Sequence, residues 1–173
     1  MTIRPLTFLP ASVLRKTAEP VKTVDEDIRQ LMDDMLETMH HEQGLGLAAP
    51  QIGQSLRVIV MDCSEEDDPD PMIWKMANPE IISASEDVAS MEEGCLSIPG
   101  YRGEVTRSAS VEVTYLDETG AQKTMQADGL LAACVQHEID HLNGKLFIDY
   151  LSRAKRDLII RKMTKDARID RDG

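Results

Sequence analysis

The stretch His137-Glu138-Ile139-Asp140-His141 is the starting point for interpreting the chain, because its spacing alone describes a chemical site. If residues 128 to 142 form a helix, the two imidazoles lie on one face with a rise of about 6 Å between them, close enough to share one metal ion. Glu138 would then lie beside the metal and could take the proton of a metal-bound water, as in the HExxH pattern. A solvated helix with two incidental histidines is the simpler alternative.

Two histidines do not hold a catalytic metal alone, so a third ligand is needed. In the patterns of metal proteases it is a later His or Glu, but Phe147 stands where the His would be. The 29 residues after Gly144 contain no Glu. Cys134 would lie on the same face as His137, but it is separated from His141 by about 10 Å of helix, which one ion cannot bridge. The third ligand must therefore come from elsewhere.

Cys95 is the candidate for the missing ligand. It lies in the stretch Glu92-Glu93-Gly94-Cys95-Leu96-Ser97-Ile98-Pro99, which we expect to form a loop between strands. A cysteine beside glycine in an exposed loop can be presented to a metal, which binds it as the thiolate. A reduced, half-buried thiol without a metal is the alternative.

Length and composition indicate one domain, residues 1–173, that can bury a core without disulfides. We expect no membrane association, because no run of 18 apolar residues occurs and the first ten residues lack the order of a secretory signal. Three cysteines are an odd number, which favours reduced thiols over a disulfide framework. These features predict a cytoplasmic protein.

Charge divides the chain at Leu151. The whole chain carries −12, but residues 1–150 hold 11 Lys and Arg against 27 Asp and Glu, which gives −16. Residues 151–173 hold 8 basic against 4 acidic residues, which gives +4. The acidic body argues against DNA binding, whereas the basic C-terminal segment could meet a polyanion by one end.

The coarse pattern favours an α+β fold, with antiparallel sheets packed around the helix that carries His137 and His141. An arm over residues 3–22 precedes an amphipathic helix, which we expect to begin at a capping box from Thr23 to Glu26. A C-terminal helix capped by Ser152 would turn Leu158, Ile159 and Met163 toward the body. Strands are expected at Arg57–Asp62, at Ile73–Ser83 with an interruption at Asn78-Pro79, and in a hairpin of Ala109–Tyr115 and Gln122–Gln126. The absence of βαβ alternation supports the α+β class.

The stretch Gly44-Leu45-Gly46-Leu47-Ala48-Ala49-Pro50-Gln51 allows close backbone approach, so an extended ligand could lie along Gly46. An ordinary helix end followed by a buried turn explains the same residues equally well. Gln51 stands out, because a buried amide needs hydrogen bonds and its NH₂ can point at a developing oxyanion.

Three stretches together, Gly44 to Gln51, Glu93-Gly94-Cys95-Leu96-Ser97 and Gln136 to His141, resemble the three signature motifs of the peptide deformylases, in the same order. The resemblance covers nearly the whole chain. It implies a metallohydrolase that removes the formyl group from the N-terminal formylmethionine of new bacterial polypeptides and releases formate.

The resemblance also implies roles for individual residues. Cys95, His137 and His141 would hold one divalent ion, and Glu138 would act as general base and then as general acid. The Gln51 amide and the Leu96 backbone N–H would hold the oxyanion. Iron, as Fe²⁺, is the usual metal of the family, with nickel or cobalt as functional substitutes, while the ligand set also suits Zn²⁺.

The face of the expected helix before His137 predicts a substrate pocket. Cys134, Ala133 and Leu130 lie three, four and seven residues before His137. With Met91, which the resemblance adds, they would line an apolar pocket for the methionine side chain, although core packing explains them equally well.

The basic segment predicts a partner, the ribosome near its exit tunnel, because the resemblance implies a C-terminal helix that docks on ribosomal RNA. A solvated basic face is the alternative. Two other functions stay open from the residues alone: a metal-dependent peptidase, and a non-catalytic metal-containing module that binds the ribosome.

Overall fold

The structure is a computed structural model that describes residues 1–172. Five strands form one antiparallel sheet in the order β1-β2-β3-β6-β7, and two further strands form a separate hairpin, β4-β5. The strands are β1 (Gly46–Ala48), β2 (Val58–Asp62), β3 (Ile73–Ala84), β4 (Val88–Cys95), β5 (Ile98–Ser108), β6 (Ser110–Leu116) and β7 (Gln122–Asp128). The helices are α1 (Glu26–His41), α2 (Gly129–Leu142) and α3 (Arg153–Asp172), with short 3-10 helices η1 (Ser12–Arg15), η2 (Ala49–Ile52) and η3 (Phe147–Tyr150).

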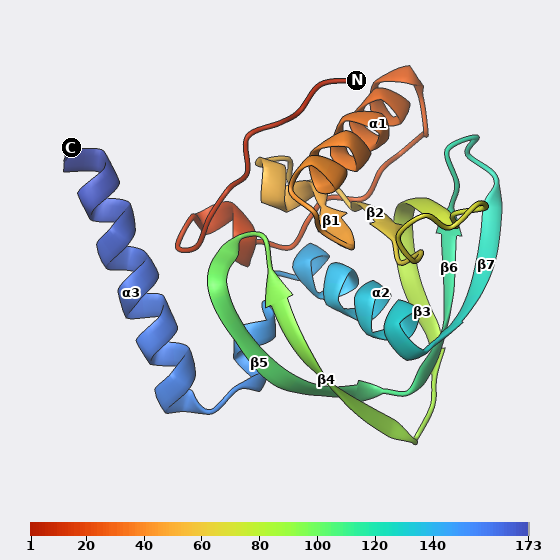
Figure 1. The fold of residues 1–173 in the computed structure, drawn as a ribbon. Coiled ribbons are helices and arrows are strands. Elements are labelled where there is room, and N and C mark those ends of the chain that lie inside the picture. Colours follow the sequence, from red (N-terminus) through yellow and green to blue (C-terminus); the bar gives the residue numbers. More distant parts are fainter. Residues whose placement is uncertain (173) are drawn as a thin grey trace.

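Helix α2 occupies the middle of the molecule, between the five-stranded sheet and the β4-β5 hairpin (Figure 1). Val135, Ile139 and Leu142 are buried against Ile59, Met76 and Val113 of the sheet. The helix ends at Leu142, and the chain turns away two residues later at Gly144, whose φ of +72° and whose closeness to the Arg15 carbonyl, 2.5 Å from an added Cβ, both require glycine. This packing holds one face of α2 against the sheet and leaves the face with both histidines for the hairpin side.

Helix α1 covers the sheet from the side of β1 and β2, with Met32, Met35 and Met39 fully buried. Its start differs from the expected capping box. The carboxylate of Asp25, rather than the Thr23 hydroxyl, accepts the Ile28 backbone N–H at 3.0 Å. A single Asp cap therefore begins this helix.

Strand β3 runs through Asn78-Pro79, where we expected an interruption. The ladder with β6 shifts register between Ala77 and Glu80, and Asn78 has a φ of +50°. The Asn78 side chain bonds the backbone N–H and carbonyl of Val21, each at 2.8 Å. The Asn-Pro pair thus makes a bulge that binds the N-terminal arm.

The β4-β5 hairpin differs from the sequence-based expectation of a loop from Glu92 to Pro99. Both strands are long, and many of their side chains are exposed, so they lack the apolar alternation that marks a half-buried strand. Cys95 accordingly lies at the end of a strand, with Leu96 and Ser97 forming the turn.

Helix α3 packs on the body only at its first part and then runs away from it (Figure 1). The Ser152 hydroxyl accepts the Lys155 backbone N–H at 3.3 Å, as expected of a cap. Ile159 and Met163 are buried, but Leu158 is 43% exposed, so the expectation that Leu158 faces the body is wrong. No helix within residues 1–172 combines the length and apolarity needed to cross a membrane.

Candidate metal site

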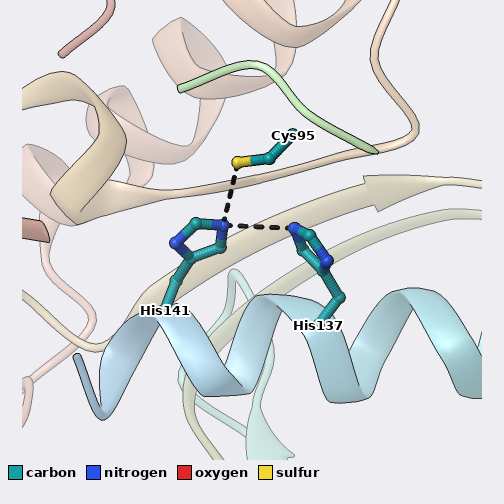
Figure 2. A group of neighbouring side chains, drawn as sticks. All are labelled: Cys95, His137 and His141. Atoms are coloured by element: carbon teal, nitrogen blue, oxygen red, sulfur yellow. Dashed lines mark hydrogen bonds between the residues drawn. The ribbon is translucent and has the colours of Figure 1, made fainter. Parts of the chain in front are cut away.

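Three potential ligands converge where the end of β4 meets helix α2. Nε2 of His137 and Nε2 of His141 are 3.2 Å apart, and Sγ of Cys95 lies 3.4 Å from Nε2 of His141 (Figure 2). All three ligand atoms lie within 4.8 Å of one another. The structure therefore brings together the two helical histidines and the cysteine singled out from a distant stretch.

The turn after β4 and the short helix η2 position the thiol. Cys95 pairs with Ile98 across a register shift in the hairpin. Nε2 of Gln51 lies 3.4 Å from Sγ of Cys95 and donates to the Ser97 hydroxyl at 3.2 Å. The other end of that amide, Oε1, accepts the Ala48 backbone N–H at 2.9 Å, so the NH₂ group must face the thiol.

Glu93, two residues before Cys95, orients His137. Its Oε1 accepts a hydrogen bond from Nδ1 of His137 at 2.8 Å, which leaves Nε2 to face the other ligands. Arg107 holds the same carboxylate through two bonds, Nε to Oε2 at 2.7 Å and Nη2 to Oε1 at 3.0 Å. Sequence reasoning missed both residues. Glu93 lies in the same motif as Cys95, so its carboxylate could have been identified as a neighbour of a candidate ligand. No sequence pattern around Arg107 indicates a role in the site.

The two imidazoles differ in how readily they bind a proton. Burial lowers the pKa of His141 well below its usual value, and the neighbouring charges of His137 and Arg107 lower it further. Burial also lowers the pKa of His137, but hydrogen bonds to Cys95 and Glu93 outweigh burial and raise it to about 10. Metals and protons compete for the same imidazole nitrogen, so a cation here would displace that proton.

Glu138 lies beside the ligands with a carboxylate that is almost completely buried. Burial raises its pKa to about 7. Among residues 1–172, its Oε2 is one of the few buried side-chain atoms without a hydrogen-bond partner. A buried polar atom without a partner is costly, so this oxygen points to a group that binds in the site.

The donor set fits one divalent transition metal. One sulfur and two imidazole nitrogens are typical ligands of such ions, and three protein ligands leave a position free for chemistry. Asp140 and Cys134 lie on the same helix but outside the group of three ligands.

A cavity of about 460 Å³ opens onto these residues. Gln51, Leu96, His137 and Glu138 contribute to its wall, together with all five residues predicted for substrate binding: Gly46, Met91, Leu130, Ala133 and Cys134. Leu130 is 46% exposed and lies at the surface end, whereas Cys134 is buried. The cavity therefore joins two of the candidate ligands, Cys95 and His137, to a recess lined by Met91, Leu130 and Ala133.

Comparison with known proteins gives a consistent result. The family model described as polypeptide deformylase matches residues 3–157. The peptide deformylase of Rhizobium meliloti is 52% identical over 169 residues, which cover 97% of this chain and 96% of that protein. The peptide deformylase of Agrobacterium fabrum is 53% identical over 169 residues, which cover 97% of this chain and 98% of that one.

Solved structures agree with the sequence relatives. The crystal structure of peptide deformylase from Ehrlichia chaffeensis matches with a TM-score of 0.91 at 42% identity, over 98% of this chain and 99% of that chain. A second structure from the same organism, in complex with actinonin, matches with a TM-score of 0.91 at 43% identity, over 96% of this chain and 98% of that chain.

Proposed function

Because this chain belongs to the polypeptide deformylase family and is a metal-dependent hydrolase of formylated nascent peptides, we propose that its catalytic centre is the Cys95-His137-His141 group. The substrate is the N-formyl group of formylmethionine, and the products are formate and the free amine. The observation that carries the proposal is the buried Glu138 oxygen without a partner, beside three converging ligand atoms.

A divalent ion held by these side chains would supply Lewis acidity, which makes a water molecule nucleophilic near neutral pH. Glu138 takes the proton from the attacking water and delivers it to the nitrogen of the leaving amine. Its burial favours this role, because a pKa raised to about 7 allows the carboxylate both to accept and to donate a proton near neutral pH.

The oxyanion of the tetrahedral intermediate is held by the Gln51 side chain and the Leu96 backbone N–H. The bond from the Ala48 backbone fixes the Gln51 amide so that its NH₂ group faces Cys95 and the cavity. A donor aimed where charge develops contributes about 3 kcal/mol to lowering the barrier.

The methionine side chain of the substrate occupies the recess lined by Met91, Leu130, Ala133 and Cys134, and the peptide backbone passes Gly46. These five residues share one cavity with Glu138, which supports the assignment. The small Ala133 leaves room for a long unbranched side chain.

We further propose Fe²⁺, the ion that the resemblance implies, as the native metal, with Ni²⁺ or Co²⁺ as active substitutes and Zn²⁺ as a competitor. The donor set alone does not discriminate among these ions, so the choice needs a measurement. Anaerobic purification with metal analysis, followed by activity before and after exposure to air, would identify the ion. Iron content that tracks activity supports the assignment, and full activity with zinc alone would contradict it.

We also propose that residues 1–173 act as one catalytic domain in the cytoplasm, where nascent chains emerge, and that the basic helix α3 meets ribosomal RNA. The exposed cations on α3 include Arg161, Lys162, Lys165 and Arg168. A helix that carries them away from an acidic body would approach a polyanion by one end.

One assay separates the proposed function from its alternatives. Hydrolysis of formyl-Met peptides, with no cleavage of acetylated or unblocked peptides, is expected of a deformylase. Cleavage of internal peptide bonds would identify a peptidase, and no hydrolysis by the metal-loaded protein would identify a non-catalytic module. Actinonin, which is bound in the Ehrlichia chaffeensis complex, should occupy the same cavity and inhibit the reaction.

A further inference from the structure

A chain of hydrogen bonds, buried at Glu93 and Arg107 but exposed at Tyr150, connects the candidate metal site to the segment before helix α3. Arg107 is only 7% exposed and bridges two carboxylates. It holds Glu93 through two bonds and donates from Nη1 to Oδ2 of Asp140 at 2.8 Å. Glu93 in turn binds Nδ1 of His137. A change in the hydrogen bonds of Asp140 can therefore alter the orientation of His137 through the guanidinium of Arg107.

The hydroxyl of Tyr150, at the end of η3, forms a hydrogen bond with Asp140. It donates to Oδ2 at 2.6 Å, the same oxygen that accepts Arg107, and it accepts longer bonds from Nη1 of Arg107 at 3.4 Å and from Nζ of Lys145 at 3.2 Å. The Tyr150 ring lies 4.7 Å below the Arg107 guanidinium and 4.8 Å from the Lys145 ammonium. Burial raises the pKa of Tyr150, and the bond to Asp140 raises it further, so the phenol stays protonated as a donor.

We infer that Tyr150 is a positioning residue for the metal centre, acting through Asp140 and Arg107 to hold Glu93 against His137. The inference rests on the proposed function only in taking His137 as a metal ligand. Tyr150 lies outside the three motifs, yet it should affect the affinity for the metal and the geometry of its ligands.

The physical basis is competition for one guanidinium. Asp140 and Glu93 both bind Arg107, and each accepts one further hydrogen bond, Asp140 from the Tyr150 hydroxyl and Glu93 from Nδ1 of His137. Without that hydroxyl, the partly buried Asp140 oxygen has one charge-stabilising bond fewer, and it attracts Arg107 more strongly. Arg107 then holds Glu93 less firmly, and the Nδ1 bond that orients the His137 ring weakens. Outer partners of this kind tune metal affinity without touching the ion.

The test is Tyr150→Phe, which removes the hydroxyl and keeps the ring beneath both cations. Competition against a chelating dye measures Co²⁺ affinity, and the visible d–d bands of the Co²⁺ protein report ligand geometry. The loss of an outer partner of a metal ligand costs about 10- to 100-fold in affinity, so a more remote one should raise the Co²⁺ dissociation constant about three- to tenfold. The d–d bands should shift. An unchanged constant with unchanged bands overturns the inference.

A second variant separates this role from simple anchoring of η3. Asp149, on the same short helix, accepts Arg15 at 2.7 Å and the Leu146 backbone N–H at 3.0 Å, with no bond to Asp140. Asp149→Asn should lower Tm while leaving the Co²⁺ bands in place. If it weakens Co²⁺ as much as Tyr150→Phe does, Tyr150 only fastens the helix and the inference is wrong.

A double-mutant cycle tests the route through Asp140. In an Asp140→Asn background, Tyr150→Phe should change the Co²⁺ constant less than twofold, because the intermediate charge is gone. A full effect in that background overturns the route. A parent protein that binds no Co²⁺ at all would remove the metal centre itself, a failure distinct from an unresponsive Tyr150.

Discussion

A Cβ atom on Gly46 would lie 2.5 Å from Oε1 of Glu138, closer than real Cβ contacts allow. Strand β1 therefore passes directly against the proposed proton carrier, and the absence of a side chain at residue 46 leaves room for the Glu138 carboxylate.

Gly46→Ala should displace Glu138 while the candidate ligands stay in place. We expect metal content to be unchanged and kcat to fall by at least about tenfold, since misplacing a catalytic group by 1 Å can cost more than that. Parallel metal analysis and steady-state kinetics would check this, and an unaffected kcat would show that Glu138 adjusts without loss.

Substitutions of the three cysteines should differ in how much bound metal they remove. Cys95→Ser should lose most of its bound metal and activity, because a hydroxyl is a far poorer ligand than a thiolate. Cys63→Ser and Cys134→Ala are the matched controls and should retain metal, since neither belongs to the converging group. Metal-to-protein ratios after dialysis measure the outcome. Equal losses in Cys134→Ala and Cys95→Ser would refute the ligand assignment.

Glu138→Gln separates proton transfer from metal binding. The amide is nearly the same shape as the carboxylate but cannot accept the proton of the attacking water. We expect bound metal to remain and turnover to drop by at least about a hundredfold, the usual contribution of a general base. Single-turnover rates with a formyl-Met peptide provide the measurement. Normal turnover would remove Glu138 from the mechanism.

The convergence of the three candidate ligands could be predicted from sequence, because their signals are local or carried by ordered motifs. The HExxH spacing places His137 and His141 on one helical face without knowledge of the fold. Cys95 is indicated as a candidate ligand by its glycine-flanked stretch and by the resemblance, and the polypeptide deformylase family that the motifs implied is confirmed. The antiparallel α+β class followed from the lack of βαβ units and is also observed.

The supporting network could not be predicted, because it depends on pairings between distant residues. Arg107 meets Glu93 across 14 residues and Asp140 across 33. No periodicity in one segment reports such a contact. The β4-β5 hairpin was missed for a related reason: its polar strands pair with each other and bury few side chains, so the alternation that reveals a strand is weak.

The recess beside the metal predicts a steric limit on the substrate. Ala133 lines the cavity on the face of α2 that leads to His137. Ala133→Phe would fill the space proposed for the methionine side chain, so KM for formyl-Met peptides should rise by at least about tenfold, as expected when one good apolar contact is lost. Bound metal should not change. An unaltered KM would place the methionine side chain elsewhere and leave Ala133 as a packing residue.

Helix α3 predicts a salt-dependent contact with ribosomes. Arg161, Lys162 and Lys165 are exposed, whereas Ile159 and Met163 on the same helix are buried against the body. Reversing the three cations to Glu therefore changes the charge of the outer face and preserves the packing that a truncation after Tyr150 would remove.

The variant should keep its kcat/KM on short formyl-Met peptides, because none of the three side chains lines the cavity at the candidate metal site. It should lose co-sedimentation with ribosomes at low salt, where phosphate contacts contribute most. The parent should pellet at low salt and be released as salt rises. A variant that pellets like the parent, with the same salt dependence, would show that α3 is only a solvated basic helix.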